Sequence, residues 1–179
     1  TLTVTLLEPP NHRALDEATF AGGCFWGVEL AYQREPGVVR TEVGYAQGAD
    51  PSPSYEAVCS GVTGHTEAVR VRYDPARVSY ERLCDLLLDR LGENRYALNR
   101  VGNDQGTQYR HGIYFRDDAQ KKTAEAVIAR VKQRFIQTKA FGSFCGALDQ
   151  AMWLRDHAEL RRRQRHKEQL VEKGLKARD

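Results

Sequence analysis

The sequence predicts an α+β fold of the ferredoxin-like type, a two-layer sandwich in which helices pack on a mixed sheet and long loops carry the function. The order of elements is the first indication, because it reads strand–helix–strand and then strand–helix–strand–helix. Residues 66–75 alternate apolar and polar side chains, which is typical of a half-buried strand. Residues 79–91 repeat apolar side chains at the helical spacing of three and four. With 179 residues, we expect one catalytic domain over 1–179.

The first predicted unit runs from a strand through a helix to a second strand. Residues 17–23 (EATFAGG) form a short apolar stretch that ends in two glycines. Residues 24–35 follow a helical pattern, which stops before Pro36. Residues 38–46 (VVRTEVGYA) are strand-like. We therefore expect a sharp turn between the first strand and the helix.

The second predicted unit follows a loop rich in Gly, Pro and Ser, residues 48–65, which we expect to be a long ordered loop or a pair of short turns. The alternating strand after it places Val69 and Val71 on one face and Arg70 on the other. Ser79 is a suitable N-cap for the helix that ends before Gly92.

The third predicted unit again begins with a polar loop. Residues 93–110 contain glycines and lead into the strand 111–116 and an Asp-capped helix. The apolar face of that helix comprises Ala124, Val127, Ile128, Val131 and Phe135. Long loops in compact domains are usually functional, so we expect the site in these two loops and at the turn before the first helix.

Charge and cysteine usage limit the classes of function. The net charge is only +3, and it comes from the C-terminal segment, which we expect to be a divergent helical segment over about 150–179. Its basic run, residues 161–167, suits nucleic acid or an anionic surface, but it has no interleaved aromatics, so a solvated helix face is favoured.

No apolar run is long enough to span a membrane. Four cysteines without a secretory signal indicate a reducing compartment, the cytoplasm or an organelle reached after removal of a targeting segment.

Cys24 stands at the predicted turn from the first strand into the helix. Unpaired backbone N–H groups at a helix start favour an anion, so the position favours a thiolate. Gly22 and Gly23 let the chain turn sharply and expose the sulfur. Phe25 and Trp26 are either core residues or two rings that hold a small apolar group such as a methyl. No CxxC pair is present, which argues against a thiolate zinc site.

Five segments carry a family resemblance: GGCFWGVE, VGYAQG, SYEAVCSGVTGHTEAVRVRYDP, SYERL and GNDQGTQYR. In this order and spacing they resemble the signature blocks of the A-type peptide methionine sulfoxide reductases. The resemblance runs from about 19 to 135. It implies an enzyme that reduces the S epimer of methionine sulfoxide, free or in proteins, with no metal and no bound organic cofactor.

The resemblance also implies roles for particular residues. Cys24 would attack the sulfoxide sulfur and become a sulfenic acid, while Phe25 and Trp26 would hold the substrate methyl group. Tyr55, Glu67 and Tyr109 would surround the sulfoxide oxygen, and Asp104 would help to set this network. The sulfoxide oxygen needs a proton as it leaves the sulfur. Glu67 would therefore act as a general acid whose pKa is raised by burial. Neutral tyrosine hydroxyls would stabilise the oxygen without charge.

The C-terminal segment departs from the resemblance. Many relatives carry resolving cysteines in a Gly-rich tail, but residues 154–179 contain no cysteine. Three routes of regeneration therefore stay open. Cys145 could be the resolving cysteine, Cys59 could take that role, or an external thiol (thioredoxin, glutaredoxin or glutathione) could reduce Cys24 directly. In some single-cysteine relatives the reactive residue is selenocysteine, which a Cys at position 24 would conceal.

Two other classes of function remain as alternatives. A cysteine hydrolase or acyltransferase would use Cys24 with His65 as general base. A module that binds nucleic acid or an anionic surface would act through the basic tail. For the leading interpretation we expect a monomer whose partners are methionine sulfoxide in peptides and proteins and a thioredoxin-type reductant.

Overall fold

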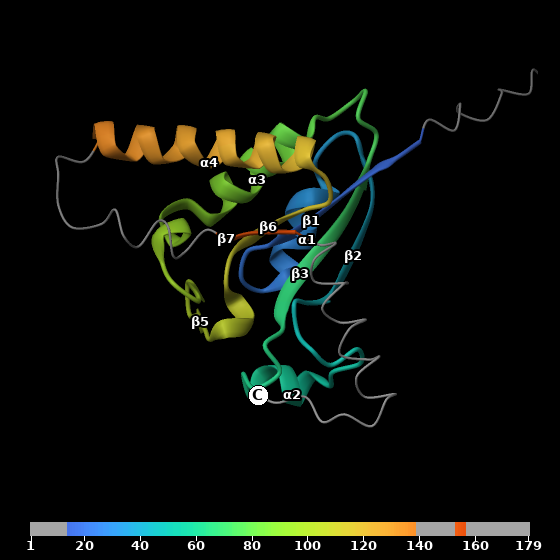
Figure 1. Cartoon of the computed structure of the whole chain (residues 1–179), viewed down its shortest axis with the longest axis vertical. Helices are drawn as coiled ribbons and strands as arrows, with labels where there is room; N and C mark the ends of the chain where they lie inside the picture. The colour runs from blue at the N-terminus through green and yellow to red at the C-terminus, as the bar shows by residue number, and fades with distance from the viewer. Residues whose placement is uncertain (1–13, 139–152, 157–179) are drawn as a thin grey trace, which may run out of the picture.

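The computed structural model describes residues 14–138 and 153–156 of the chain. The strands are β1 (Asp16–Ala21), β2 (Val38–Ala46), β3 (Thr66–Tyr73), β4 (Arg100–Val101), β5 (Asp104–Gln105), β6 (Gly112–Phe115) and β7 (Trp153–Asp156). The helices are α1 (Phe25–Gln33), α2 (Tyr55–Cys59), α3 (Tyr80–Leu91) and α4 (Asp118–Thr138), with 3-10 helices η1 (Gly92–Tyr96) and η2 (Thr107–Tyr109). Figure 1 shows their arrangement.

The main sheet has the strand order β2-β3-β1-β6-β7. β1 and β2 are both antiparallel to β3, which lies between them, and β6 is antiparallel to β1. The elements β1-α1-β2-β3-α3-β6 thus form the ferredoxin-like βαββαβ arrangement. β7 makes the sheet mixed, because it pairs with β6 in parallel. The predicted fold class is confirmed.

The hydrophobic core lies between the helices and one face of the sheet. β3 follows the predicted alternation, with Val69 and Val71 fully buried and Arg70 exposed. Leu83 and Leu87 of α3 pack on this face in the same apolar cluster. Each fully buried side chain of this kind stabilises the fold by about 1.5–3 kcal/mol. The core fills one face of the sheet, and the loops at one end are left to form the site.

Both predicted loops contain short elements of secondary structure that the sequence pattern does not predict. Ser54 caps the one-turn helix α2, because its hydroxyl accepts a hydrogen bond from Ala57 N at 3.2 Å. The loop 93–110 contains η1, the two-stranded β4–β5 sheet and η2. Short elements of this kind lack a long apolar periodicity, which is why pattern alone does not reveal them.

The C-terminal segment differs from expectation at four residues. The predicted helical segment begins near 150, yet Trp153–Asp156 form strand β7. A sheet edge offers unpaired N–H and C=O groups, and β7 pairs with those of β6. The rest of the basic tail and Cys145 lie outside the described residues. No helix in the described part of the chain is long and apolar enough to cross a membrane.

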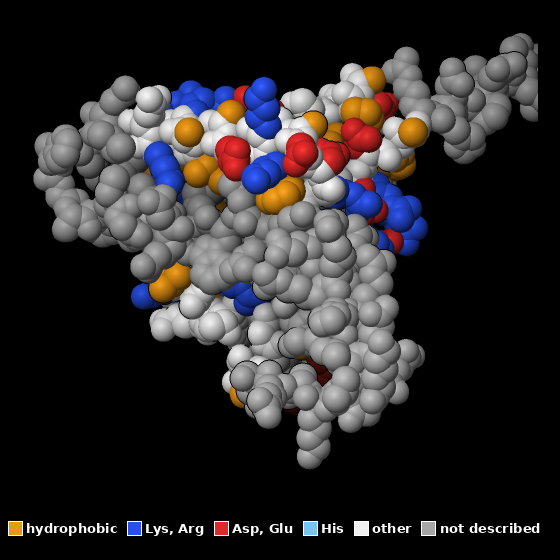
Figure 2. All heavy atoms as spheres, viewed as in Figure 1, with side chains coloured by type: hydrophobic (Ala, Val, Ile, Leu, Met, Phe, Trp, Pro, Cys, Tyr) orange, Lys and Arg blue, Asp and Glu red, His pale blue; other side chains and the backbone are white. Residues whose placement is uncertain are grey.

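Charged side chains cover the outer side of the helices. Figure 2 shows Lys, Arg, Asp and Glu side chains interspersed with hydrophobic ones along the top of the molecule, where α4 lies. Arg130 of α4 pairs with Glu81 and Asp85 of α3, so these two helices are joined at the surface as well as through the core. Mixed charges of this kind are typical of a solvated face.

Candidate active site

Cys24 is the N-cap residue of α1, as the sequence predicted for a thiol at the helix start. The preceding turn depends on Gly23, whose φ is +82°, a conformation that residues with a Cβ rarely adopt. A Cβ at this position would also lie 2.6 Å from Cβ of Val101. Cys24 is a half-buried free thiol whose side chain makes no capping hydrogen bond. Its sulfur is therefore not used to complete the helix.

The buried carboxyl of Glu67 contacts this helix start. It is the second residue of β3 and only 5% exposed. Its Oε2 accepts a hydrogen bond from the backbone N–H of Phe25 at 2.8 Å. Burial raises the pKa of Glu67, the Phe25 N–H opposes this, and the charge of Asp104 raises the pKa further. The net effect favours the neutral acid at a higher pH than usual.

Asp104 and Tyr109 approach this carboxyl from the second loop. Asp104 begins β5 and is half-buried, and Tyr109 ends η2. Burial raises the pKa of Tyr109, and the charges of Glu67, Asp104, Cys59 and Cys24 raise it further. A hydroxyl with a raised pKa stays protonated and can donate a hydrogen bond.

Tyr55 reaches the same group of residues from α2. Its side chain is 59% exposed, so it lies at the rim. A hydrogen bond with Cys59 raises the pKa of Tyr55 to about 12, and the charges of Cys59, Tyr109 and Glu67 add to this. Cys59 itself is an exposed free thiol on the same helix.

The two aromatic residues after Cys24 have different surroundings. Phe25 is partly buried against the hydrophobic core, with its ring centroid 5.8 Å from that of Tyr45. Trp26 is 64% exposed, and its ring meets that of Phe25 edge to face at 5.2 Å. Trp26 is therefore not a core residue, whereas Phe25 belongs to both the core and the site.

The sequence-predicted residues from three separate segments thus converge on the start of α1. Their roles stay predictions, but their proximity is a feature of the structure. Cys145 lies outside the described residues.

Several residues near the site were not singled out from the sequence. Tyr45 lies opposite Glu67 in the β2–β3 pairing, and burial, followed by the charge of Glu67, raises its pKa. Arg110 binds Gln47 and the backbone around His65. These residues lie inside the segments that carry the family resemblance, so those segments could have pointed to them. Taken singly, a polar residue in such a segment has an ordinary structural explanation.

His65 does not occupy the position of a general base for Cys24. It is 5% exposed, and its ring lies so close to Gly48 that a Cβ there would be 1.9 Å from Cε1. Burial lowers the pKa of His65. Within the described residues no hydrogen bond joins it to Cys24, and Nδ1 has no partner. The hydrolase alternative is thus not favoured.

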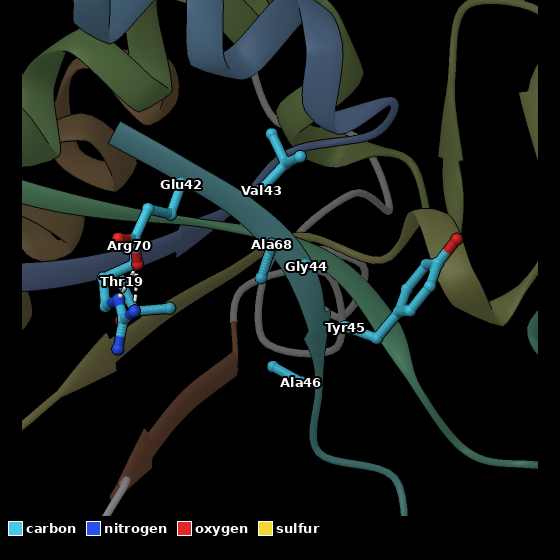
Figure 3. A pocket seen from close by; sticks show the side chains of 8 residues that line it. All are labelled: Thr19, Glu42, Val43, Gly44, Tyr45, Ala46, Ala68 and Arg70. Carbon is cyan, nitrogen blue, oxygen red and sulfur yellow. Dashed lines mark hydrogen bonds and ion pairs between the residues drawn. The ribbon is translucent and has the colours of Figure 1, made fainter. Parts of the chain in front are cut away.

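A separate hollow of about 210 Å³ lies on the sheet face away from Phe25 and the core. It is lined by Thr19, Glu42, Val43, Gly44, Tyr45, Ala46, Ala68 and Arg70. Figure 3 shows Glu42 paired with Arg70 there, while the ring of Tyr45 points away. In the described part of the chain, no group of three or more His, Cys, Asp and Glu could hold a metal ion.

Comparisons with known proteins identify a family for the chain. The family described as "Peptide methionine sulfoxide reductase" matches residues 16–149. Peptide methionine sulfoxide reductase A1 of Arabidopsis thaliana is 55% identical over 115 residues, covering 64% of this chain and 56% of that protein. The chloroplastic protein A4 of the same plant is 54% identical over 113 residues, covering 63% and 43%. The chain thus spans about half the length of these curated relatives.

Solved structures extend the comparison to the fold. Methionine sulfoxide reductase A of Corynebacterium diphtheriae aligns with a TM-score of 0.68 at 31% identity, covering 84% of this chain and 68% of that one. Reduced Mxr1 of Saccharomyces cerevisiae aligns with a TM-score of 0.62 at 30% identity, covering 79% and 75%. Since the family match covers most of the sequence and the fold agrees, the chain belongs to the peptide methionine sulfoxide reductase family.

Proposed function

We propose that the protein reduces the S epimer of methionine sulfoxide, free or in proteins, to methionine. The observation that carries this proposal is the hydrogen bond from the backbone N–H of Phe25 to Glu67, which holds a buried carboxyl at the start of the helix that has Cys24 as its N-cap residue. A thiol nucleophile and a neutral carboxylic acid are the two groups that oxygen transfer from a sulfoxide to a thiol requires.

The chemistry follows from these two groups. The sulfur of Cys24, as the thiolate, attacks the sulfoxide sulfur, while Glu67 gives its proton to the sulfoxide oxygen. The attack forms a bond between the two sulfurs; the substrate sulfur–oxygen bond then breaks, the protonated oxygen bonds to the Cys24 sulfur, and the sulfur–sulfur bond breaks with its electron pair on the substrate, which leaves a sulfenic acid on Cys24. The substrate is reduced to a thioether, and the cysteine is oxidised by the same two electrons.

The tyrosines stabilise the oxygen as its bond to sulfur weakens. The raised pKa values of Tyr109 and Tyr55 keep both hydroxyls protonated, so they can donate hydrogen bonds without adding charge. Asp104 contributes through its charge, which raises the pKa of Glu67. We assign the substrate methyl group to the edge-to-face rings of Phe25 and Trp26, because an apolar contact of this size discriminates about 10- to 200-fold.

Regeneration requires a thiol reductant. A thiol attacks the sulfenic acid to give a disulfide and water, and a second thiol then releases Cys24. We propose thioredoxin, glutaredoxin or glutathione as the external reductant, with Cys145 or Cys59 as alternative internal partners. Cys24, Cys59 and Cys84 are free thiols, which suits a reducing compartment such as the cytoplasm.

The test is thiol counting with mass mapping after one turnover. Reduced protein is mixed with excess S-epimer methyl sulfoxide and no reductant. One thiol lost as a sulfenic acid on Cys24, or two lost as a Cys24-linked disulfide, supports the proposal and identifies the regeneration route. No thiol lost would exclude the proposed function.

The same assay tests the acid. Glu67→Gln keeps the shape of the side chain but cannot supply a proton, so the single-turnover rate near neutral pH should fall by roughly 100-fold or more. Substrate affinity should change little. An unchanged rate would remove Glu67 from the mechanism.

A further inference from the structure

Arg110 donates hydrogen bonds to three different segments of the described chain. Its Nε and Nη2 donate to Oε1 of Gln47 at 3.0 and 2.8 Å. Its Nη1 donates to the carbonyls of His65 and Thr107 at 3.0 and 2.7 Å. Its Nη2 also donates to the carbonyl of Gly64 at 2.8 Å. A guanidinium has five N–H donors, so each donor is matched by one of these bonds.

The partners of Arg110 lie in the segments that lead to residues of the site. The carbonyls of Gly64 and His65 precede Glu67 at the start of β3. Thr107 begins η2, which ends at Tyr109. Gln47 follows β2 and opens the loop that leads to Tyr55. Arg110 therefore ties the backbone before Glu67 to the backbone before Tyr109, and it joins both to the side chain of Gln47.

Thr66 adds a second link between the same two segments. Its hydroxyl is fully buried and donates to the carbonyl of Gln108 at 2.9 Å. Thr66 is the neighbour of Glu67, and Gln108 is the neighbour of Tyr109. The start of β3 and helix η2 are therefore held together by the side chain of Thr66 and by that of Arg110, the residue that follows η2.

We propose that Arg110 is the positioning residue that holds Glu67 against the start of α1 and in register with Tyr109. Arg110 acts through Glu67 and is not itself a proton donor to substrate. Lysine cannot replace it, because one ammonium offers three donors from a single point and cannot reach carbonyls in three segments. The catalytic consequence rests on the proposed function, but the positioning does not.

The backbone N–H of Phe25 offers a readout that needs no substrate. It donates to Oε2 of Glu67, so its NMR chemical shift should follow the protonation of that carboxyl. Tyr45, Tyr55, Asp104 and Tyr109 interact with the charge of Glu67, and none of them is changed in the variants below. If Glu67 loses its fixed position, it gains water, and the titration midpoint should move down towards that of an ordinary carboxyl.

The experiment compares Arg110→Lys and Thr66→Val with wild type. Arg110→Lys keeps the positive charge, so a shift in the Phe25 midpoint reports geometry. We expect a lower midpoint and a kcat near neutral pH reduced by roughly 10- to 100-fold, with KM little changed. Thr66→Val should also lower the Phe25 titration midpoint and kcat, but by smaller amounts than Arg110→Lys. Arg130→Met is the control, because Arg130 binds side chains of α3 and should change neither quantity.

The outcomes separate the two proposals. A Phe25 midpoint in Arg110→Lys equal to that of wild type would overturn the positioning role. If Arg110→Lys does not fold, the Phe25 titration midpoint of Thr66→Val is compared with that of wild type instead, and equal midpoints would overturn the proposal. A wild-type protein that oxidises no thiol with the sulfoxide would end the proposed function, whereas a shifted Phe25 midpoint would still support the role of Arg110.

Discussion

The carboxylate of Glu67 accepts a hydrogen bond from the backbone N–H of Phe25, the residue next to Cys24, at 2.8 Å. This N–H is one of the groups that a helix leaves unpaired at its start, and such groups favour an anion. Burial of Glu67 favours the neutral acid instead, and burial is the larger effect, so the pKa is raised. The contact therefore positions the carboxyl without holding it ionised.

The raised pKa of Glu67 should make stability depend on pH. Between the unfolded and folded pKa values the native state binds more protons, so the free energy of unfolding falls as pH rises through this window. Glu67→Gln removes the titrating group. We expect urea unfolding to show a stability gain of Glu67→Gln over wild type at pH 8 that disappears below the unfolded carboxyl pKa.

Glu42 serves as a control, because its effect on the pH dependence of stability has the opposite sign to that of Glu67. Its hydrogen bond with Arg70 lowers the pKa of Glu42, so its contribution to stability is present above the unfolded pKa and is lost as pH falls through the folded pKa. Glu42→Gln should therefore be less stable than wild type at pH 8 and equal to it in acid. The same sign of pH dependence for both variants would contradict the assignment for Glu67.

Trp26→Ala should weaken substrate binding without unfolding the protein. The indole ring is 64% exposed, so its removal should leave the Tm nearly unchanged. The loss of an apolar contact of this size should weaken transition-state binding by about 1–3 kcal/mol and lower kcat/KM for a methyl sulfoxide accordingly. Leu30→Ala removes another exposed apolar side chain of α1 and serves as the control. Equal kcat/KM values for Trp26→Ala and wild type would remove Trp26 from the methyl site.

Gly48→Ala should destabilise the loop that leads to Tyr55. A Cβ at position 48 would lie 1.9 Å from Cε1 of His65, and that ring is buried and has little room to move. Forced overpacking typically costs about 1–3 kcal/mol. Gly44→Ala is a matched control, because its Cβ would meet nothing within 4 Å. Urea midpoints that are equal for the two variants would show that the loop shifts freely.

The described cysteines should differ in reactivity. Cys84 is fully buried on α3, and burial raises its pKa to about 12, so its thiolate is scarce at pH 8. Cys24 is half-buried and Cys59 is exposed. With iodoacetamide at pH 8 we expect peptide mapping to find Cys24 and Cys59 labelled, and Cys84 labelled only after urea is added. Labelling of native Cys84 at the rate of Cys59 would contradict its burial.

The order of strands and helices could be predicted from local patterns. The alternation at Val69 and Val71 and the cap at Ser79 depend on residues within a few positions of each other. Helix α2 and strand β7 were not predicted. α2 is only one turn long, and β7 depends on pairing with β6, a strand distant in sequence.

By itself the sequence determined the βαββαβ order, the placement of Cys24 at a helix start and the likeness of its motifs to one family, because each depends on neighbouring residues. Only the tertiary structure decided that Glu67 binds the backbone of Phe25, 42 positions away, and that Arg110 joins three loops. Burial and proximity arise from packing between distant segments, so the raised pKa of Glu67 follows from the fold.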